Sequence, residues 1–368
     1  MFEITHEDKK SSARTGILKT AHGKFETPFF MPVATKAAVK YASFEDLKKI
    51  NAQCVISNSF VLYLKPGLDV IEKAGGLHKF ENWNRSIFTD SGGFQCSRES
   101  FYLQTTDKGL HLRNPFDGRL HVLTPELSME IQSILGSDIA MCLDDMPNYS
   151  KDKKYVAQKT KTTHAWAERC LAAHDNDKQL LFGIAQGGIF TDIRKKSMKF
   201  ISSLNVDGVA LGGLAIGEPV SKMYDMISTT IRMSPTTKPR YLMGVGSPED
   251  LFKCISLGMD CFDSTFPTQN ARHNTLFTSA GKIKIYKAQY KSDFNPIDDE
   301  CNCPVCKKYT RAYIHHLQRM EEPLGKMLTT VHNLAFIINF MKDIRTAIKE
   351  DRYEKFKNEF LKNFTLDN

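Results

Sequence analysis

Eight short apolar runs, separated by helical patterns, constrain the fold of this chain more than any other feature of its sequence. Each run is rich in β-branched and large apolar residues and is followed by a polar loop and then a helix-like pattern. Near-continuous apolar strands that alternate with helices are typical of a parallel sheet covered on both faces. The runs are residues 29–35, 54–59, 87–92, 138–145, 180–186, 208–213, 240–246 and 261–267.

Eight strand and helix units predict an α/β fold, an eight-stranded parallel β/α barrel of the TIM type. Helix-start signals lie between the runs: Thr124 precedes Pro125, and Ser247 precedes Pro248, so that each hydroxyl can cap a helix whose first residue is proline. A doubly wound open sheet is the alternative architecture. The chain of 368 residues is long enough for one barrel, and one domain over residues 1–368 is favoured over two.

Two segments interrupt this alternation. Residues 109–123 alternate in polarity around Asp117 and Gly118, which predicts a hairpin inserted after the third strand. A cysteine-bearing segment follows the eighth strand and is expected to form a small metal-bound subdomain at about 285–335. The last forty residues are expected to form an amphipathic helix, at about 335–364, with one apolar face that contains Ile337, Met341, Ile344 and Ile348.

Nine cysteines are present, and three of them are clustered. The other six are scattered through apolar segments, as is usual for reduced core residues rather than a disulfide framework. Three thiolates and one imidazole would make a closed tetrahedral zinc site of the structural kind, with His332 as fourth ligand and His315 or His316 as alternatives. The clustered residues form a C-x-C-x-x-C turn of Cys301, Cys303 and Cys306.

The charge and the termini limit the partners and the compartment. The net charge of +8 comes from scattered lysines, which permits a polyanionic partner such as nucleic acid without requiring one. The first ten residues carry no apolar segment of the kind a secretory signal needs. The longest apolar stretch, residues 333–341, is much shorter than the roughly 20 residues that cross a bilayer. We therefore expect a cytoplasmic protein that does not insert into a membrane.

Polar residues stand where the predicted strands end. In a parallel barrel the reactive groups come from the carboxyl ends of the strands. A single acid there is often only a helix cap or a turn former, but two carboxylates that face one pocket can act as nucleophile and general acid on a glycosidic bond. A barrel glycosidase acting on sugars is one enzyme of this kind. The strand-end residues are Asn58, Asp90, Asp144, Asp145, Gln186, Gly213 and Asp263.

With these residues assembled, the sequence resembles the tRNA-guanine transglycosylases of the bacterial type, also called queuine tRNA-ribosyltransferases. The resemblance runs from about Thr5 to Phe364 and rests on the motifs TDSGGFQ, GIAQGG, GGLAIGEP, YLMGVG and FDSTFPT, with the cysteine turn and its distant histidine. It implies a barrel with one structural Zn²⁺ per subunit and a homodimer. The implied activity is that of a pentosyltransferase of queuosine biosynthesis, which exchanges guanine at the wobble position of tRNAs with G-U-N anticodons for a 7-deazaguanine.

The resemblance also implies roles for individual residues. Asp263 would be the nucleophile that forms a covalent intermediate with the ribose, and Asp90 would be the general acid and base. Further roles follow from the matched motifs: reading of the base edge by Asp144, Gln186 and Gly213, stacking by Phe94, proximity to the 7-substituent for Leu214 and Glu218, and contacts to the anticodon loop by Thr268, Gln269 and Arg272.

The chain departs from the family pattern at several positions. Gln269 stands where an arginine is common, Val61 where a histidine is usual, and Met146 where bacterial members often have cysteine. Ile216 is bulky where queuine users tend to have glycine, which predicts a preference for 7-aminomethyl-7-deazaguanine, with queuine as the alternative base. The family also contains non-catalytic tRNA-binding subunits, but both catalytic acids are present here.

Overall fold

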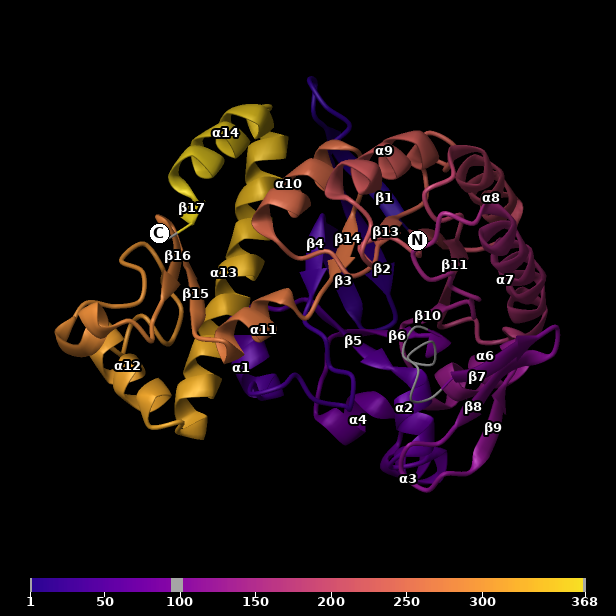
Figure 1. Ribbon diagram of the computed structural model, residues 1–368, viewed down its shortest axis with the longest axis horizontal. Coiled ribbons are helices and arrows are strands. Elements are labelled where there is room, and N and C mark those ends of the chain that lie inside the picture. The colour runs from indigo at the N-terminus through magenta and orange to yellow at the C-terminus, as the bar shows by residue number, and fades with distance from the viewer. Residues whose placement is uncertain (1, 94–101, 367–368) are drawn as a thin grey trace.

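The computed structural model describes residues 2–93 and 102–366, and its centre is a sheet of eight parallel strands (Figure 1). The strands follow one another in the order β4-β14-β13-β12-β11-β10-β6-β5. Each of the eight predicted runs coincides with one of them, so the predicted strands are confirmed. Their bounds are β4 (Phe29–Met31), β5 (Cys54–Asn58), β6 (Ser86–Asp90), β10 (Ile139–Met141), β11 (Leu180–Ala185), β12 (Gly208–Leu211), β13 (Arg240–Leu242) and β14 (Cys261–Asp263).

The sheet closes on itself between its first and last strands. Just beyond β4, Val33 forms a parallel bridge with Ile56 of β5. The Ala34 N–H donates to the Ile56 carbonyl at 2.7 Å, and the Ile56 N–H donates to the Pro32 carbonyl at 3.1 Å. The predicted barrel is therefore confirmed over the open sheet, and all eight strands end at one rim.

Aromatic side chains fill the barrel interior. The rings of Phe182 and Tyr241 both pack against Phe88, with centroid distances of 5.7 and 5.8 Å. Leu18 and Phe25 complete this buried cluster from outside the barrel, on a three-stranded antiparallel sheet that the sequence analysis did not predict. The interior is thus a packed core rather than a pore. The additional sheet consists of β1 (Phe2–Glu7), β2 (Arg14–Thr20) and β3 (Gly23–Thr27).

Helices cover the outside of the barrel, and two of them begin as predicted. The Thr124 hydroxyl accepts the Leu127 N–H at 3.2 Å, and the Ser247 hydroxyl accepts the Asp250 N–H at 3.1 Å. The helices of the barrel are α1 (Phe44–Lys49), α2 (Ser59–Leu64), α3 (Leu68–Ala74), α4 (Leu77–Glu81), α6 (Pro125–Leu135), α7 (Lys153–Ala173), α8 (Thr191–Ser203), α9 (Val220–Ile231), α10 (Pro248–Ser256) and α11 (Phe266–Arg272).

The predicted hairpin is present after the third barrel strand. Strands β8 (Gly109–Arg113) and β9 (Leu120–Leu123) pair antiparallel around Asp117 and Gly118, and β7 (Tyr102–Thr106) adds a third strand. This small sheet therefore stands beside the rim at which β6 ends.

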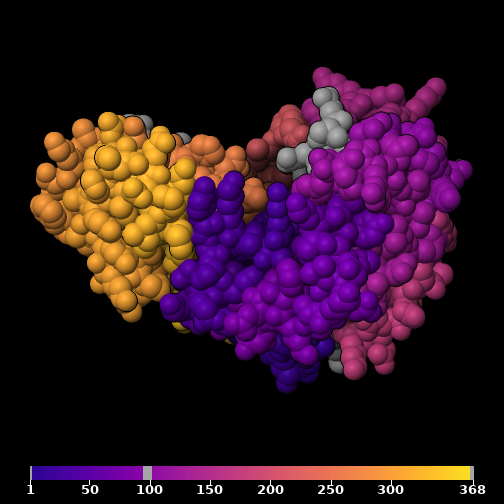
Figure 2. Space-filling model, turned by 90° about the horizontal axis from the view of Figure 1, so that it is seen from below, coloured from indigo at the N-terminus to yellow at the C-terminus, as the bar shows by residue number. Residues whose placement is uncertain are grey.

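The C-terminal segment forms a lobe beside the barrel, and a broad notch separates the two in Figure 2. Here the structure differs from its prediction, because two helices replace the single amphipathic one. The first, α13, begins at Pro323 and is buried around most of its circumference, and the chain turns at Asp351, which has a φ of 54°. The elements of the lobe are β15 (Thr275–Thr278), β16 (Gly281–Lys284), η1 (Ala288–Ser292), α12 (Arg311–Arg319), α13 (Pro323–Lys349), α14 (Tyr353–Asn363) and β17 (Thr365–Leu366).

A buried arginine docks this lobe to the barrel. Arg345 of α13 donates from Nη1 to the carbonyl of Pro28, next to β4, at 2.8 Å.

Among the helices of the described residues, none is both long enough and apolar enough to cross a membrane.

Candidate active site

A cavity of about 400 Å³ opens at the rim where the barrel strands end. Five of the residues that the sequence analysis placed at strand ends line it together, whereas Asp145 does not and instead pairs with Lys159 at 2.7 Å. Gln186 is fully buried behind this lining rather than part of it. The lining includes Asn58, Asp90, Asp144, Gly213, Leu214 and Asp263.

Asp90 ends β6 and is held by donors on both oxygens. The Gly92 N–H donates to Oδ1 at 2.9 Å, and the Asn58 side-chain amide donates to Oδ2 at 3.0 Å. Asn58 cannot turn its amide around, because its Oδ1 caps helix α2 by accepting the Val61 N–H at 2.7 Å. The side chain of Val61, the unusual residue here, is buried below the site and contributes only its backbone. The cap of α2 therefore fixes the Asn58 side chain, and the Asn58 amide in turn orients the Asp90 carboxylate.

Burial raises the pKa of Asp90 to about 7, and the nearby charge of Asp263 adds to the rise, against the donors at Gly92 and Asn58. A carboxyl group with this pKa populates both protonation states near neutral pH. It can therefore give or take a proton there.

Asp263 ends β14 and has its two oxygens in different environments. Its Oδ1 accepts the Tyr241 hydroxyl at 2.6 Å and the Gly244 N–H at 3.0 Å. Its Oδ2 has no hydrogen-bond partner among the described residues. Burial raises the pKa of Asp263, while the Tyr241 hydroxyl opposes the rise. One oxygen fixes the carboxylate and the other remains available for chemistry.

The two acids stand on β6 and β14, which are separated in the closed barrel by β4 and β5. Both strands are short and are paired on each side, so neither acid depends on a flexible loop for its position. Both side chains line the same cavity. A substrate in this cavity can therefore meet both carboxylates.

Asp144 and Gln186 form a second polar wall. Gln186 donates from Nε2 to Asp144 Oδ2 at 2.6 Å, whereas its Oε1 is buried and has no partner in the described part of the chain. Burial raises the pKa of Asp144 to about 6, against the hydrogen bond from Gln186. The Gln186 amide also lies so close to Gly213 that a Cβ there would meet Oε1 at 2.4 Å. Asp144 and Gly213 therefore present polar groups that a planar heterocycle can match, while Gln186 holds Asp144 from behind the lining.

Arg194 of α8 is a functional candidate that the sequence analysis missed. It is fully buried, and its guanidinium donates to four backbone carbonyls in the loops after β11 and β12. Burial lowers the pKa of Arg194 to about 9. The guanidinium thus ties together the two loops that carry Gln186 and Gly213. The accepting carbonyls are those of Gly188 at 2.8 Å, Ala185 at 3.2 Å, Gly212 at 2.7 Å and Gly213 at 3.0 Å.

Glu218 faces its own loop. Its carboxylate accepts the Ala215 N–H at 2.6 Å and the Ile216 N–H at 3.0 Å. Leu214 and Ile216 line the cavity, so the shape of its wall depends on how Glu218 folds this loop. In this structure Glu218 therefore influences the surroundings of a ligand substituent indirectly, through the loop that its carboxylate folds.

The glycines after Asp90 are required by close packing. Gly92 has a φ of 81°, and a Cβ there would meet the Phe60 Cβ at 2.3 Å. Gly93 lines the cavity against Asp144. Phe94, the predicted stacking residue, lies outside the described residues.

The three predicted RNA contacts lie on α11, which begins at the rim. Gln269 is exposed, but Thr268 is buried and donates its hydroxyl to the Thr265 carbonyl at 3.0 Å. Arg272 is half-buried and donates from Nε to the Thr268 carbonyl at 3.1 Å. The side chain of Thr268 is therefore used within the helix, while Gln269 is exposed and Arg272 is partly exposed.

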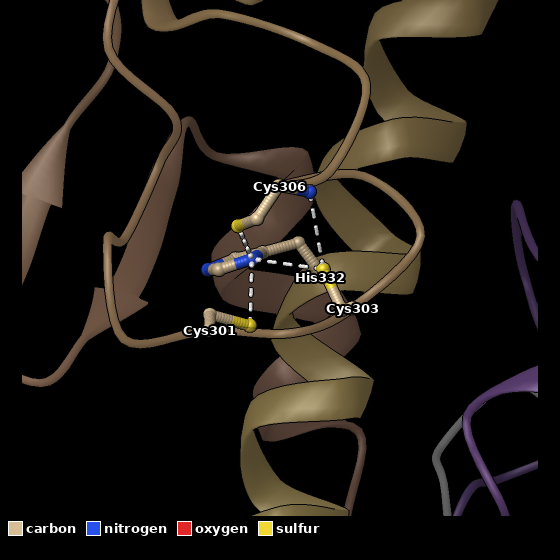
Figure 3. A group of neighbouring side chains, drawn as sticks. All are labelled: Cys301, Cys303, Cys306 and His332. Atoms are coloured by element: carbon tan, nitrogen blue, oxygen red, sulfur yellow. Dashed lines mark hydrogen bonds between the residues drawn. The ribbon is translucent and has the colours of Figure 1, made fainter.

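The predicted cysteine cluster assembles around His332 of α13 (Figure 3). His332 Nε2 is 2.7 Å from the Phe277 carbonyl, which can only accept, so Nδ1 is left as the ligand atom. His315 bonds the Ile285 carbonyl at 2.8 Å, and neither His315 nor His316 belongs to the group of ligand atoms that comes together with the three cysteines. The distances from His332 Nδ1 are 4.0 Å to Cys301 Sγ, 3.6 Å to Cys303 Sγ and 3.3 Å to Cys306 Sγ.

These distances fit a metal ion. Tetrahedral Zn²⁺ bonds of about 2.3 Å to sulfur and 2.1 Å to nitrogen imply a sulfur to nitrogen separation of about 3.6 Å. The four donor atoms lie within 4.8 Å of one another, and Cys303 and His332 are buried. The cluster can therefore hold one metal ion with no open position for a substrate.

Fold and site together define a β/α barrel with two carboxylates, Asp90 and Asp263, at strand ends on one cavity, an arrangement typical of barrel enzymes. Comparison with known proteins assigns it to a family: the family model described as queuine tRNA-ribosyltransferase matches residues 8–365. The chain belongs to the queuine tRNA-ribosyltransferase family and is a pentosyltransferase.

Relatives named queuine tRNA-ribosyltransferase match over nearly their whole length. The protein of Halothermothrix orenii is 47% identical over 363 residues, which cover 99% of this chain and 97% of that one. The protein of Staphylococcus haemolyticus is 49% identical over 372 residues, covering 100% and 98%. The protein of Bacillus subtilis is 47% identical over 364 residues, covering 99% and 96%.

Replacing Arg194 tests whether it organises the site. Arg194→Met leaves four buried carbonyls without their donor and is expected to lower the free energy of unfolding by about 3 kcal/mol in urea titrations. Arg194→Lys keeps the charge but cannot span both loops, so it should stay folded and lose transferase activity. Arg232→Met, at an exposed arginine, is the control and should change neither quantity. An active, fully stable Arg194→Met protein would contradict this role.

Proposed function

We propose that this chain is a tRNA-guanine transglycosylase that exchanges guanine at the wobble position of tRNAs with G-U-N anticodons for a 7-deazaguanine, in queuosine biosynthesis. The observation that carries the proposal is the pair of differently held carboxylates, Asp90 and Asp263, on one cavity. The names of the relatives support tRNA and a deazaguanine-type base as substrates. A cavity of about 400 Å³ is within the range of small-ligand sites.

In the first displacement Asp263 is the nucleophile. Its free oxygen, Oδ2, attacks the anomeric carbon of the ribose, and the bond from that carbon to guanine breaks with the electron pair going to the base. Asp90, in its protonated form, gives its proton to the departing guanine and so neutralises the charge that develops there. The product of this step is an ester between Asp263 and the RNA ribose. Because Tyr241 and Gly244 fix the other oxygen, the attacking one is already positioned.

In the second displacement the same two acids act in reverse. Asp90, now ionised, takes the proton from the ring nitrogen of the incoming 7-deazaguanine. That nitrogen attacks the anomeric carbon, and the ester bond to Asp263 breaks to return its carboxylate. Two inversions give retention at the sugar, and no bond in the RNA backbone is cut. The rigid strand ends supply the orientation for both steps.

The base is read by the polar wall opposite the acids. The carboxylate of Asp144 and the peptide groups at Gly213 line the cavity and offer acceptors and donors in one region. Gln186 is buried behind this lining and acts on the base through its 2.6 Å hydrogen bond to Asp144. Arg194 holds the loops after β11 and β12 in fixed relative positions for this contact.

Binding of the RNA requires the wobble base to leave its stack, at a cost of a few kcal/mol. The net charge of +8 favours the phosphate backbone and offsets part of this cost. Gln269 and Arg272, on the helix that starts at the rim, are placed to contact the anticodon loop. Gln269 lacks the charge of the arginine that is common there, so its contact would be a neutral hydrogen bond.

The cysteine cluster would hold one structural Zn²⁺ per subunit. Cys301, Cys303, Cys306 and His332 are the ligands, and the Phe277 carbonyl orients the imidazole. When bound, the ion supplies folding free energy to the C-terminal lobe and no chemistry at the ribose.

We further propose that the chain acts as a homodimer that associates through the C-terminal lobe. Several large apolar side chains of this lobe are exposed, and large exposed apolar groups often mark association surfaces. They are Tyr286, Phe294, Tyr313, Met320, Leu324 and Met327.

Asp263→Asn tests the nucleophile. The substitution keeps the size of the side chain but removes its nucleophilic oxygen, so both base exchange and the denaturant-resistant RNA adduct should be lost on denaturing gels. Asp250→Asn is the matched control, because Asp250 also accepts a tyrosine hydroxyl, from Tyr224, but lies away from the cavity. An adduct that survives in Asp263→Asn would place the nucleophile elsewhere. A wild-type protein that binds tRNA without exchange would indicate a non-catalytic subunit.

Tyr241→Phe tests the hydrogen bond that fixes Asp263. Activity needs Asp90 protonated and Asp263 ionised, so kcat/KM should fall as pH rises through about 7 and fall again as Asp263 becomes protonated at low pH. Loss of the Tyr241 donor raises the pKa of Asp263, so the fall of kcat/KM at low pH should begin about one pH unit higher. The fall at high pH, which reports Asp90, should stay in place. Tyr224→Phe is the control. A low-pH fall of kcat/KM that is unchanged in Tyr241→Phe would refute the assignment of that fall to Asp263.

Competition between 7-aminomethyl-7-deazaguanine and queuine tests which base the enzyme prefers. Ile216 narrows the cavity wall, so the wild type should have the higher kcat/KM for 7-aminomethyl-7-deazaguanine, and Ile216→Gly should shift the ratio toward queuine by about tenfold or more. Ile216→Val, a smaller change, should leave the ratio nearly unchanged. A wild-type preference for queuine would overturn this choice and support the salvage of queuine instead.

A further inference from the structure

A second group of possible metal ligands lies apart from the cysteine cluster, near the amino-terminal ends of the barrel strands. His22 lies in the turn between β2 and β3, His78 lies in α4, and Asp138 immediately precedes β10. One donor atom of each residue lies within 4.8 Å of the others. Neither the proposed transfer chemistry nor the active-site cavity uses these residues.

Asp138 is the fixed member of this group. Its side chain is fully buried, and each oxygen accepts one backbone N–H at 2.9 Å, from His22 to Oδ1 and from Ile87 to Oδ2. These backbone hydrogen bonds hold the carboxylate in place, as outer hydrogen bonds hold a metal-ligating carboxylate.

The two histidines present nitrogens to the same carboxylate. His22 Nδ1 is 3.0 Å from Asp138 Oδ1, and His78 Nε2 is 3.1 Å from Asp138 Oδ2. These separations are close to those between neighbouring ligands of one transition-metal ion. A divalent cation bound by all three residues would compensate the charge of the carboxylate in this largely buried place. Imidazole and carboxylate together suit a first-row ion such as Zn²⁺.

The imidazole rings must separate slightly to share an ion. Their centroids are 3.6 Å apart and their planes differ by 20°, so the rings are stacked. The proton on each nitrogen that faces Asp138 must move to the other ring nitrogen or be released when an ion binds. The side chain of His22 is 41% exposed, in a turn, whereas that of His78 is 12% exposed. Tilting His22 outward would direct both nitrogens at a point in front of Asp138 while the backbone hydrogen bonds to the carboxylate remain.

We propose that His22, His78 and Asp138 form a second metal site, for a divalent first-row ion such as Zn²⁺, which fastens the N-terminal sheet to the base of the barrel. Three protein ligands leave at least one position for water. Because β2 and β3 supply Leu18 and Phe25 to the barrel core, an ion at their turn would stabilise the packing of that core. This site is separate from the transfer chemistry, and its test does not depend on that activity.

Metal analysis tests the proposal on the full-length protein. After incubation with excess Zn²⁺ and desalting, the wild type should carry one more ion per chain than His22→Gln or His78→Gln. Glutamine keeps a hydrogen-bond donor toward Asp138 but is a poor zinc ligand, so these variants should fold normally without added zinc. In protein whose cysteine cluster is already loaded with zinc, further zinc should also raise the Tm of the wild type, because an ion that binds only the folded state stabilises it. This additional rise should be absent in both variants.

His6→Gln is the matched control, because His6 belongs to the same N-terminal sheet and contacts one carboxylate, Asp351, at 3.0 Å without a second histidine. It should retain the additional ion and the rise in Tm. If His78→Gln does not fold, His22→Gln on the exposed turn supplies the same comparison. An equal metal content in the wild type and in His22→Gln, or a zinc-induced rise in Tm that persists in that variant, would overturn the proposal.

Discussion

Closure of the barrel between the segment after β4 and strand β5 is the constraint on which the rest of the structure depends. Two backbone hydrogen bonds between residues 32–34 and Ile56 join the ends of the sheet. Closure brings eight strand ends to one rim and places Asp90 and Asp263 on one cavity although 172 residues separate them in sequence. It also requires a filled interior, and the N-terminal sheet helps to fill it with Leu18 and Phe25.

The proposed chemistry depends on how differently the two acids are held. Asp90 has a donor on each oxygen and a pKa of about 7, which suits proton transfer near neutrality. In the described part of the chain, Asp263 has both of its donors, Tyr241 and Gly244, on one oxygen, which leaves the other for the proposed bond formation. Separate environments for two carboxylates are the general means of giving them separate roles.

The sequence predicts much of this arrangement because the relevant signals are local. Apolar runs show the strands, residues after them show the rim, and the cysteine spacing shows the metal cluster. The sequence does not show that Arg194, an ordinary cation in an amphipathic helix, turns inward to bind loop carbonyls. It also does not show that Thr268 is buried, or that the short alternating strands β1–β3 cap the barrel. These features depend on contacts between segments that are distant in sequence, and no local pattern encodes such contacts.

Incorporation of labelled guanine into tRNA tests the central claim most directly. The protein would be incubated with unmodified tRNA of a G-U-N anticodon and radiolabelled guanine, and the labelled nucleotide would then be mapped. The account predicts label at the first anticodon position alone, with an intact RNA backbone, and none in a tRNA whose first anticodon base is adenine. Release of guanine without incorporation would instead indicate hydrolysis at the ribose by a glycosidase. That result would contradict exchange by two carboxylates on one rim.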